Sequence, residues 1–391
     1  MPAIQVPKSS WRDDEELEIF DRSVREFFSR EATPEKMAKW RENGVVDRDM
    51  WTKAGQAGLL CVSAPEEFGG AGGDFRHDAV IMYAMGEMGI DGFGASLHNA
   101  IVAPYIYHYG SKEQKERWLP RMATGELVGG IAMTEPGAGS DLQGVKTTAK
   151  KDGNHYVING SKTFITNGQQ ANLIIVVAKT DPTQGAKGTS LILVETDEVA
   201  NDSGGFRRGR NLDKVGQDAQ DTSELFFEDV RVPTSNLLGP MEGQGFIQLM
   251  QQLASERLQI AIQGVAMMER ALTLTAQYVK ERKAFGKTLM DFQNTQFKLA
   301  ECKTKATIAR VFVDHCTERL LKGELDAATA SMAKYWVSDT QCEVVDECLQ
   351  LHGGWGYMNE MDIGRMYRDA RVQRIYGGAN EVMKVLIART L

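Results

Sequence analysis

The chain has 391 residues, a net charge of −8, 42% hydrophobic residues and 25% charged residues. This length is too great for one ordinary core, so two or three domains are expected in a soluble globular protein. The acidic balance excludes the usual basic surface of a nucleic-acid-binding protein, and no apolar run is long enough to span a bilayer.

The cysteines and the N-terminus bear on the cellular compartment. Five cysteines, an odd number without CxxC spacing, predict free thiols in a reducing compartment. Four consecutive acidic residues at positions 13–16 disfavour a transit peptide. We therefore expect a cytoplasmic bacterial protein, or a mitochondrial matrix protein whose presequence has been removed. The six histidines show no ligand spacing, so we expect no metal site.

Residues 1–128 are predicted to be mainly helical. Between residues 11 and 30, apolar side chains recur at helical spacing, as Leu17, Val24 and Phe28 illustrate. A glycine-rich run at residues 69–73 predicts a loop between helices.

Residues 129–240 have the chemistry of β-structure. Strands are predicted at residues 156–158, 163–166, 173–177, 191–194 and 225–227. Three dipeptides typical of hairpin turns punctuate the region: Asp152-Gly153, Asn159-Gly160 and Asn167-Gly168. Their close spacing predicts a small barrel or sandwich.

Residues 241–391 are predicted to be helical again, with long segments at 246–283, 291–321 and 324–352. The order is therefore helices, strands, helices, which gives three domains at 1–128, 129–240 and 241–391. This order favours an α+β fold over a doubly wound sheet.

Two nucleotide-binding motifs are absent. No GxGxxG follows a predicted strand, which disfavours a dinucleotide-binding Rossmann site. The tripeptide Gly286-Lys287-Thr288 is not a phosphate loop, because that motif needs a glycine where Glu281 stands. Any nucleotide cofactor must then be held by side chains and turns from several segments.

Four short segments carry chemistry that a single function could explain. Residues 131–141 form a glycine-rich turn that lets backbone N–H groups approach a planar ring or a thioester chain. Residues 164–167 place an aromatic and a threonine at a strand end. Residues 281–287 and 350–354 combine cations, an aromatic residue and glycines. Taken singly, each has an ordinary alternative: a Pro-Gly turn, a packed strand, cations at a helix C-terminus, or a glycine C-cap.

Together and in this order, the segments resemble the acyl-CoA dehydrogenases, and most closely their long-chain type. The resemblance runs from about residue 15 to the C-terminus. It implies that family's fold: an N-terminal helical domain, a middle β-barrel or sandwich domain and a C-terminal four-helix-bundle domain. It also implies bound FAD and a homotetramer in which Arg282 serves a neighbouring subunit's cofactor.

The resemblance assigns site residues position by position. Phe164 is expected against the flavin, where many members have tryptophan, and Ala379 replaces a common threonine. The residues expected to contact FAD are Ile131, Met133, Thr134, Gly139, Ser140, Phe164, Ile165, Thr166, Arg282, Phe285, Gln293, Gln350, Leu351, Gly353, Gly354, Ala379, Asn380 and Glu381. Those expected to contact the substrate are Ser140, Leu253, Arg257, Tyr376, Gly377 and Gly378.

The resemblance implies that the catalytic base is at a different sequence position from that in the commoner family members. Their glutamate position holds Gly377, which cannot accept a proton. The long-chain and isovaleryl types instead use a glutamate just before an arginine on the first long C-terminal helix, which corresponds to Glu256. Its helical row contains apolar or small residues such as Ile260 and Gly264, so an inward-facing carboxylate with a raised pKa is predicted. A surface glutamate is the ordinary alternative, and Glu381 is the rival base.

Gly377 has a predicted role of its own. Without a side chain it leaves room for Glu256, and its N–H can polarise the thioester oxygen. Tyr376 is expected to line the acyl chamber.

The implied activity is FAD-dependent desaturation of a long-chain acyl-CoA to the trans-2-enoyl-CoA. Glu256 removes the α-proton, the β-hydrogen goes to flavin N5, and electrons pass to an electron-transfer flavoprotein. The alternatives are a branched-chain acyl-CoA dehydrogenase, an oxidase of the same fold, and a non-catalytic acyl-CoA-binding or assembly module. No membrane insertion and no nucleic-acid partner are expected.

Overall fold

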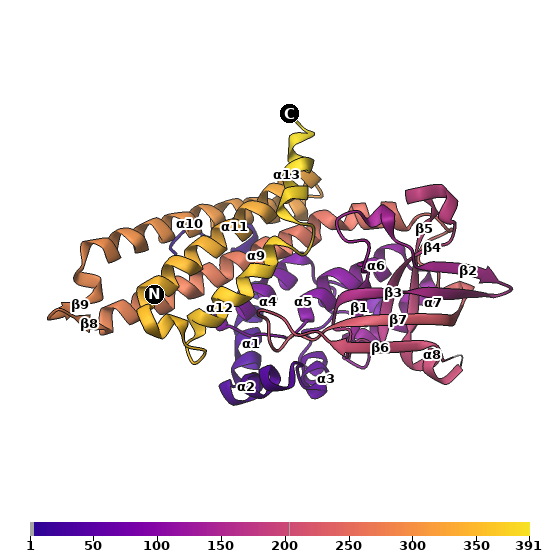
Figure 1. The fold of residues 1–391 in the computed structure, drawn as a ribbon, viewed down its shortest axis with the longest axis horizontal. Helices are drawn as coiled ribbons and strands as arrows, with labels where there is room; N and C mark the ends of the chain where they lie inside the picture. Colours follow the sequence, from indigo (N-terminus) through magenta and orange to yellow (C-terminus); the bar gives the residue numbers. More distant parts are fainter. Residues whose placement is uncertain (1–3, 203) are drawn as a thin grey trace.

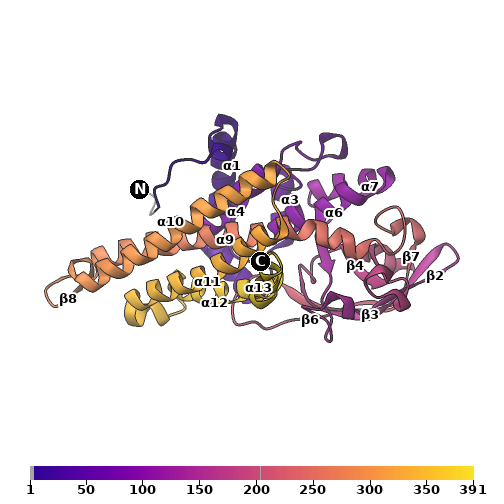
Figure 2. The same ribbon diagram turned by 90° about the horizontal axis from the view of Figure 1, so that it is seen from above.

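The structure is a computed structural model that describes residues 4–202 and 204–391. Residues 1–3 of the predicted first domain lie outside the described residues. Figures 1 and 2 show a long helical bundle on one side, a β-sheet on the other, and the N-terminal helices packed at their junction. No helix in the described ranges is both long and apolar enough to cross a membrane.

The N-terminal region is helical, as predicted. Polar caps define where its helices begin: Asp14 accepts from two backbone N–H groups of α1, and Ser111 forms a capping box with Gln114 in α7. The helices are α1 (Glu15–Glu31), α2 (Pro34–Asn43), α3 (Arg48–Gln56), α4 (Phe75–Met88), α5 (Ala95–Leu97), α6 (Ala103–Tyr109) and α7 (Lys112–Ala123). A π-helical turn, η3 (His98–Val102), joins α5 to α6. Such turns often occur at functional sites.

The middle region forms a seven-stranded sheet in the order β1-β4-β2-β3-β7-β6, with β5 paired to β4. The strands are β1 (Gly129–Ala132), β2 (Thr148–Asp152), β3 (His155–Thr166), β4 (Leu173–Lys179), β5 (Thr189–Glu195), β6 (Phe206–Asn211) and β7 (Thr222–Pro233). A short helix, α8 (Thr196–Asp202), follows β5. Strands β4 and β5 are buried along their whole length, which explains their continuous apolar sequences.

Only one of the three predicted hairpin turns is a hairpin. Asp152-Gly153 connects β2 to β3, which pair from Asp152 and His155. The Asn159-Gly160 prediction was wrong, because both residues lie inside β3 at a register shift. A β-carbon at Gly160 would lie 2.3 Å from Thr147 Oγ1, so close packing, not turning, requires glycine there. Asn167-Gly168 does turn the chain, but β4 does not pair with β3.

The C-terminal region contains three long helices at nearly the predicted positions: α9 (Gly245–Glu281), α10 (Gln293–Leu321) and α11 (Ala327–His352). Helix α11 begins three residues later than predicted, because Asp326 caps it by accepting from Thr329 N. The shorter α12 (Asp362–Ala370) packs on α9 and α11, and α13 (Asn380–Ala388) packs on α11. A small hairpin of β8 (Lys283–Ala284) and β9 (Lys287–Thr288) caps the far end of the bundle (Figure 1).

One apolar core ties the N-terminal helices to the bundle. It includes Phe28 and Tyr83 from the first region, and Leu258, Val265 and Val337 from the last, all fully or almost fully buried. A second core joins α6 and α7 to the inner strands β4 and β5. The three regions are therefore packed against one another around the middle of α9, where the cavity described next is found.

Candidate active site

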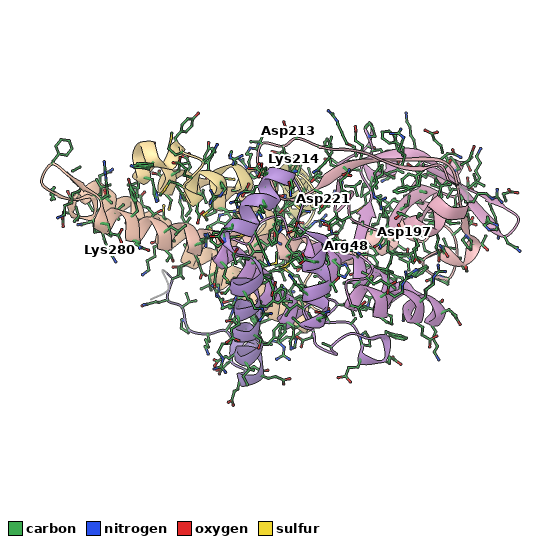
Figure 3. All side chains as sticks on the ribbon, turned by 90° about the horizontal axis from the view of Figure 1, so that it is seen from below. Arg48, Asp197, Asp213, Lys214, Asp221 and Lys280 are labelled. Carbon is green, nitrogen blue, oxygen red and sulfur yellow. The ribbon has the colours of Figure 1, made fainter. Side chains whose placement is uncertain are left out.

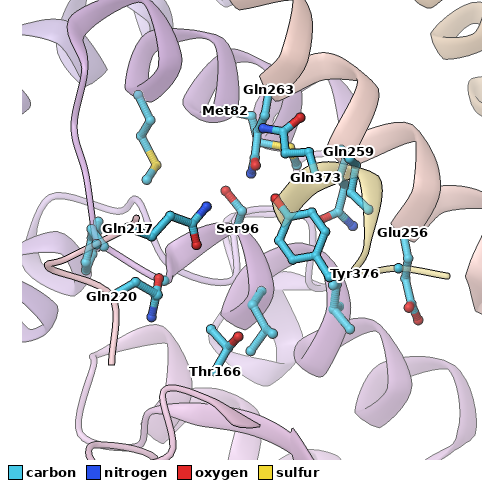
Figure 4. Close-up of a pocket in the computed structure, with 18 of the residues that line it drawn as sticks. Met82, Ser96, Thr166, Gln217, Gln220, Glu256, Gln259, Gln263, Gln373 and Tyr376 are labelled. Carbon is cyan, nitrogen blue, oxygen red and sulfur yellow. The ribbon is translucent and has the colours of Figure 1, made fainter. Parts of the chain in front are cut away.

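A cavity enclosing about 1500 Å³ of space, including its open mouth, lies where the three regions meet. Its walls come from α4 and α5, from β1 and β3, from α9, and from the segment that follows α12. Figure 4 shows that Glu256 and Tyr376 lie together on one side, with Thr166 from the sheet below. Gln217 and Gln220 stand on the opposite side.

Glu256 lies on α9 and is 5% exposed. Its Oε1 accepts a hydrogen bond of 2.9 Å from the hydroxyl of Tyr105 on α6. Burial raises the pKa of Glu256 to about 7, although the Tyr105 hydrogen bond and the charge of Arg257 act to lower it. A buried carboxylate that titrates near neutrality suits a general base.

Gly377 adopts a left-handed backbone conformation, with φ +62°. A β-carbon there would lie 2.3 Å from Cδ1 of Ile260, the residue one turn after Glu256. Both the left-handed backbone conformation and the lack of space for a β-carbon therefore require glycine at this position. The side chain that occupies the space next to Gly377 is that of Ile260. The Gly377 N–H makes no backbone hydrogen bond within the described ranges, so it is available to a ligand.

The segment around Gly377 is anchored from behind by α11. The fully buried Lys334 donates to the Gly378 carbonyl at 2.7 Å and to Asn380 Oδ1 at 2.8 Å. Asn380 Nδ2 in turn donates to Ser338 Oγ and Asp339 Oδ1, both at 2.9 Å. Burial lowers the pKa of Lys334 to about 8, with Arg257 acting in the same direction.

A loop of the sheet, residues 212–221 between β6 and β7, closes the side of the cavity away from Glu256. In Figure 3 the labelled Asp213, Lys214 and Asp221 mark it at the boundary between sheet and helices. Asp218 pairs with Arg368 of α12 through two bonds of 3.2 and 3.0 Å. Gln217 donates its N–H to the Asp369 carboxylate. Burial raises the pKa of Asp369 to about 6.

The predicted glycine-rich turn, residues 131–141, begins with the last two residues of β1, and its remainder is held by one buried cation. Lys162 Nζ donates to the carbonyls of Met133 (3.1 Å) and Val177 (2.7 Å) and to Glu135 Oε1 (2.9 Å). The Glu135 carboxylate also accepts from the N–H groups of Lys146 and Thr147. Burial lowers the pKa of Lys162 to about 8, against the opposing effect of Glu135. The backbone of the turn is therefore fixed relative to β3 and β4.

Phe164 is the side chain best suited to a flat ring. It sits at φ +60° beside a register shift of β3, and this strained position turns its ring out, 67% exposed, at the cavity wall. A non-glycine residue in this conformation commonly marks a functional site. The hydroxyls of Thr134 and Thr166 line the same wall. An exposed aromatic face beside hydroxyls and a fixed turn fits the isoalloxazine ring of a flavin.

The structure brings nine of the 24 predicted site residues into one place. The cavity is lined by Ile131, Met133, Thr134, Phe164, Ile165, Thr166, Glu256, Tyr376 and Gly377. The lining does not include eight further predicted residues: Gly139, Ser140, Leu253, Arg257, Gly378, Ala379, Asn380 and Glu381.

The other predicted cofactor residues are at the far end of the bundle. Arg282 follows α9, Phe285 is 95% exposed at the tip of the β8–β9 hairpin, and Gln293 begins α10 (Figure 1). The C-terminal end of α11 lies beside this end of α9. Tyr278 of α9 donates to the carbonyl of His352, the last residue of α11, at 3.2 Å, and the Tyr278 and His352 rings are stacked. Gln350, Leu351, Gly353 and Gly354 are therefore also at that end, away from this chain's own cavity.

Sequence reasoning missed several residues of the cavity. Gln259 and Gln263 lie on the same α9 face as Glu256, so helical spacing could have found them. Gln217, Asp369 and Gln373 come from other elements. Tyr105, which is outside the lining, donates to Glu256 from a position 151 residues earlier in the chain. No local pattern links those residues.

Comparisons with known proteins agree on one family. Family models for the acyl-CoA dehydrogenase N-terminal, middle and C-terminal domains match residues 14–126, 130–230 and 243–391. The long-chain specific acyl-CoA dehydrogenase of Sus scrofa, a mitochondrial protein, is 52% identical over 96% of this chain and 86% of its own.

Solved structures agree as well. The acyl-CoA dehydrogenase of Geobacillus kaustophilus is 47% identical, with a TM-score of 0.94 over 98% of this chain and 99% of its own. The acyl-CoA dehydrogenase of Bacillus anthracis in complex with FAD is 32% identical, with a TM-score of 0.88 over 100% of this chain and 70% of its own. The three family models together with a cavity that fits a flavin lead to one conclusion: the chain belongs to the acyl-CoA dehydrogenase family and is an FAD-dependent oxidoreductase.

Proposed function

We propose that this enzyme desaturates long-chain acyl-CoA thioesters to trans-2-enoyl-CoA, with Glu256 as the base that removes the α-proton. The observation that carries the proposal is the buried Glu256 carboxylate, with its pKa raised to about 7, in a cavity where Gly377 replaces the commoner catalytic glutamate. FAD, when bound, accepts the hydride equivalent from the β-carbon.

The chain's own residues would then orient and activate the thioester. The N–H of Gly377 is free to donate to the thioester oxygen, which would make the α-proton more acidic. Glu256 accepts that proton, and Tyr105 holds its carboxylate in place. Lys334 ties the Gly377–Gly378 backbone to α11 by donating to the Gly378 carbonyl.

The length of the cavity supports a long acyl chain. Along α9 it is lined by Glu256, Gln259, Ile260, Gln263 and Met267. A helix rises about 1.5 Å per residue, so the eleven residues from 256 to 267 cover about 16 Å. An extended chain advances roughly 1.2 Å per bond, so about 16 Å accommodates roughly 13 bonds beyond the reacting carbons.

The assembly we propose is a homotetramer, or at least a dimer, in which Arg282 and Phe285 complete a neighbour's FAD site. Phe285, 95% exposed at the hairpin tip, presents an aromatic ring that a neighbouring subunit's cofactor could contact. That tip is far from this chain's own cavity (Figure 1). An Arg282→Ala variant is then expected to lose FAD affinity in proportion to the mutant subunits in a mixed oligomer.

The deciding experiment is anaerobic bleaching of the FAD-loaded protein by hexadecanoyl-CoA, butanoyl-CoA and a methyl-branched acyl-CoA. Fast bleaching by the first is expected. The Glu256→Gln variant should keep its flavin and lose roughly 10²- to 10⁴-fold in reduction rate, the usual contribution of a general base. Glu381→Gln, which removes the rival base, is the matched control.

Other outcomes would redirect the proposal. Preferential bleaching by the branched substrate would reassign the substrate class, and near-normal reduction by Glu256→Gln would remove the base assignment. Electron-transfer flavoprotein, the acceptor that the family resemblance implies, should reoxidise the reduced enzyme much faster than oxygen does. Fast reoxidation by oxygen would indicate an oxidase.

A further inference from the structure

The far end of the acyl chamber is polar, which a plain hydrocarbon chain does not require. Beyond Ile260, the α9 wall continues with Gln263, and Gln373 faces it from the segment after α12. Figure 4 shows Gln259, Gln263 and Gln373 on the same side of the cavity, apart from Gln217 and Gln220. The amide nitrogen of Gln259 already has a hydrogen-bond partner, because Nε2 donates to the Ala100 carbonyl at 2.6 Å.

Gln373 is 2% exposed, and its Oε1 has no hydrogen-bond partner in the described part of the chain. The same holds for Oε1 of Gln341, a fully buried residue of α11. Both oxygens face one small region: a β-carbon built on Gly264 would lie 3.4 Å from Gln373 Oε1 and 3.1 Å from Gln341 Oε1. An unsatisfied buried acceptor is costly, so each oxygen needs a donor.

The side-chain amide nitrogens of Gln373 and Gln341 do not supply the donor that the two oxygens lack. Nε2 of Gln341 lies 3.2 Å from the Met267 sulfur, and Nε2 of Gln373 lies 3.8 Å from it. Thioether sulfur is a weak acceptor, which suits nitrogen on that side and leaves the oxygens directed elsewhere. Within the cavity lining, the region therefore presents the acceptor of Gln373, and Gln263 adds an amide with both donors and an acceptor, whereas Gln341 is not part of the lining.

The charge of the cavity restricts what could bind there. The charged residues that line it are Asp91, Glu256 and Asp369, and no lysine or arginine among the described residues lines it. A terminal carboxylate on the acyl chain would meet no cation in this lining, and the amide N–H groups of Gln263 alone do not neutralise its charge, which disfavours a dicarboxylic substrate. A neutral group that donates a hydrogen bond satisfies both the charge and the vacant acceptors.

We propose that the chamber is built for acyl-CoA thioesters whose chain carries a hydroxyl group far from the reacting carbons. The inference rests on the proposed function, because it assumes that the acyl chain runs from Glu256 along α9. Gln263 is about 10 Å and Met267 about 16 Å beyond Glu256 along the helix. At roughly 1.2 Å per bond, these distances place the hydroxyl between about carbons 11 and 15, counted from the thioester carbon.

The test compares flavin reduction by octadecanoyl-CoA, 12-hydroxyoctadecanoyl-CoA and 12-oxooctadecanoyl-CoA in the FAD-loaded enzyme. The hydroxy substrate is expected to exceed the plain chain roughly three- to tenfold in the ratio of reduction rate to dissociation constant, the range for one neutral hydrogen bond. The oxo substrate, which is polar but cannot donate, should show no gain. Octadecanedioyl-CoA should be the poorest of the set.

Two variants locate the preference. In Gln373→Met and Gln263→Met, which keep side-chain length, the ratio of hydroxy to plain substrate is expected to fall toward one. Gln114→Met, which removes a buried glutamine outside the cavity, should keep the wild-type ratio. If a variant does not fold, the wild-type comparison still decides.

The outcomes separate the two proposals. If none of the thioesters bleaches the flavin, the proposed function fails first. If plain and hydroxylated chains bleach it equally well, the function stands and the hydroxyl preference is wrong, because ordered water then satisfies the glutamine oxygens. A gain with the oxo substrate equal to that with the hydroxy substrate would also overturn the donor requirement.

Discussion

The hydroxyl of Tyr105 lies 2.9 Å from Oε1 of Glu256, and this contact joins the N-terminal helix α6 to the proposed base on α9. Both side chains are buried, so the hydrogen bond is sheltered from water. Tyr105 is thus a positioning residue: it fixes one carboxylate oxygen and favours the charged form of the carboxylate.

Removing this hydroxyl should move the pH dependence of catalysis. Wild-type flavin reduction is expected to lose activity as the pH falls below about 7, because protonated Glu256 cannot accept a proton. Since the Tyr105 hydrogen bond lowers that pKa, Tyr105→Phe should shift the acid limb to higher pH. At pH 6 its reduction rate should fall roughly tenfold, whereas at pH 9 it should approach wild type.

Stopped-flow reduction at several pH values measures this shift. Tyr107→Phe, on the same helix but outside the cavity, is the matched control and should leave the acid limb in place. An acid limb that Tyr105→Phe does not move would show that the hydrogen bond does not tune the base.

Gly377 offers a second prediction, on stability and geometry together. Gly377→Ala forces a side chain into a left-handed conformation and against Ile260 Cδ1, at 2.3 Å. We expect a loss of about 1–3 kcal/mol in the free energy of unfolding and a fall in reduction rate, because the N–H at this position would move. Thermal unfolding and single-turnover reduction measure the two effects.

A double variant separates the causes. Adding Ile260→Val removes the clashing methyl, so it should restore part of the stability lost by Gly377→Ala and leave the backbone strain. If Ile260→Val gives no recovery, the contact with Ile260 is not what demands glycine.

The sequence predicted the elements better than it predicted their partners. Continuous periodic apolar faces predict the three long helices within about three residues of their observed ends. The largest difference is at α11, which begins after the Asp326 cap and not at the predicted residue 324. The prediction of a turn at Asn159-Gly160 is wrong because the local sequence is the same for a turn dipeptide and for a strand in which glycine packs against Thr147. Packing across the sheet decided between them.

The same limit applies to the cavity. Glu256 was predicted to face inward from its own helical row, and it is buried. The contact with Tyr105 and the meeting of Gln263 with Gln373 depend on how separate elements dock, which no spacing within one element encodes. Local chemistry thus identified the proposed base, but not the groups that orient it.

Lys334 should support both the fold and the site. Its pKa of about 8 is below the ordinary 10.5, so the folded state carries the cost of a buried charge below pH 8. The free energy of unfolding should therefore increase as the pH rises from about 8 to 10.5, because in this range Lys334 binds more protons in the unfolded chain than in the folded one. Lys334→Met should abolish this alkaline gain, which urea unfolding at pH 7 and pH 9.5 would reveal.

The same variant should slow flavin reduction, because it leaves the Gly378 carbonyl and Asn380 without their donor. Lys305→Met, which removes a half-exposed lysine of α10, controls for the loss of a cation. A pH dependence of stability equal to that of wild type would contradict the buried-charge interpretation.

Lys162 tests whether the glycine-rich turn holds the cofactor by its backbone. Lys162→Met leaves the Glu135 carboxylate buried without its cation and the Met133 and Val177 carbonyls without a donor. Breaking a buried pair in this way costs about 3–5 kcal/mol, so we expect a lower unfolding temperature and weaker FAD binding. Flavin release during dilution, followed by fluorescence, measures the second effect.

A double variant that also changes Glu135 separates the effect of Lys162 on stability from its effect on FAD binding. Adding Glu135→Gln to Lys162→Met removes the uncompensated charge, so stability should recover in part. FAD affinity should remain low, because the Met133 carbonyl still lacks its donor and the turn remains free to move away from β3. Full recovery of both properties would mean that Lys162 serves only to neutralise Glu135, and that the turn keeps its shape through the Thr163 N to Thr134 carbonyl bond of 2.9 Å and its own backbone hydrogen bonds.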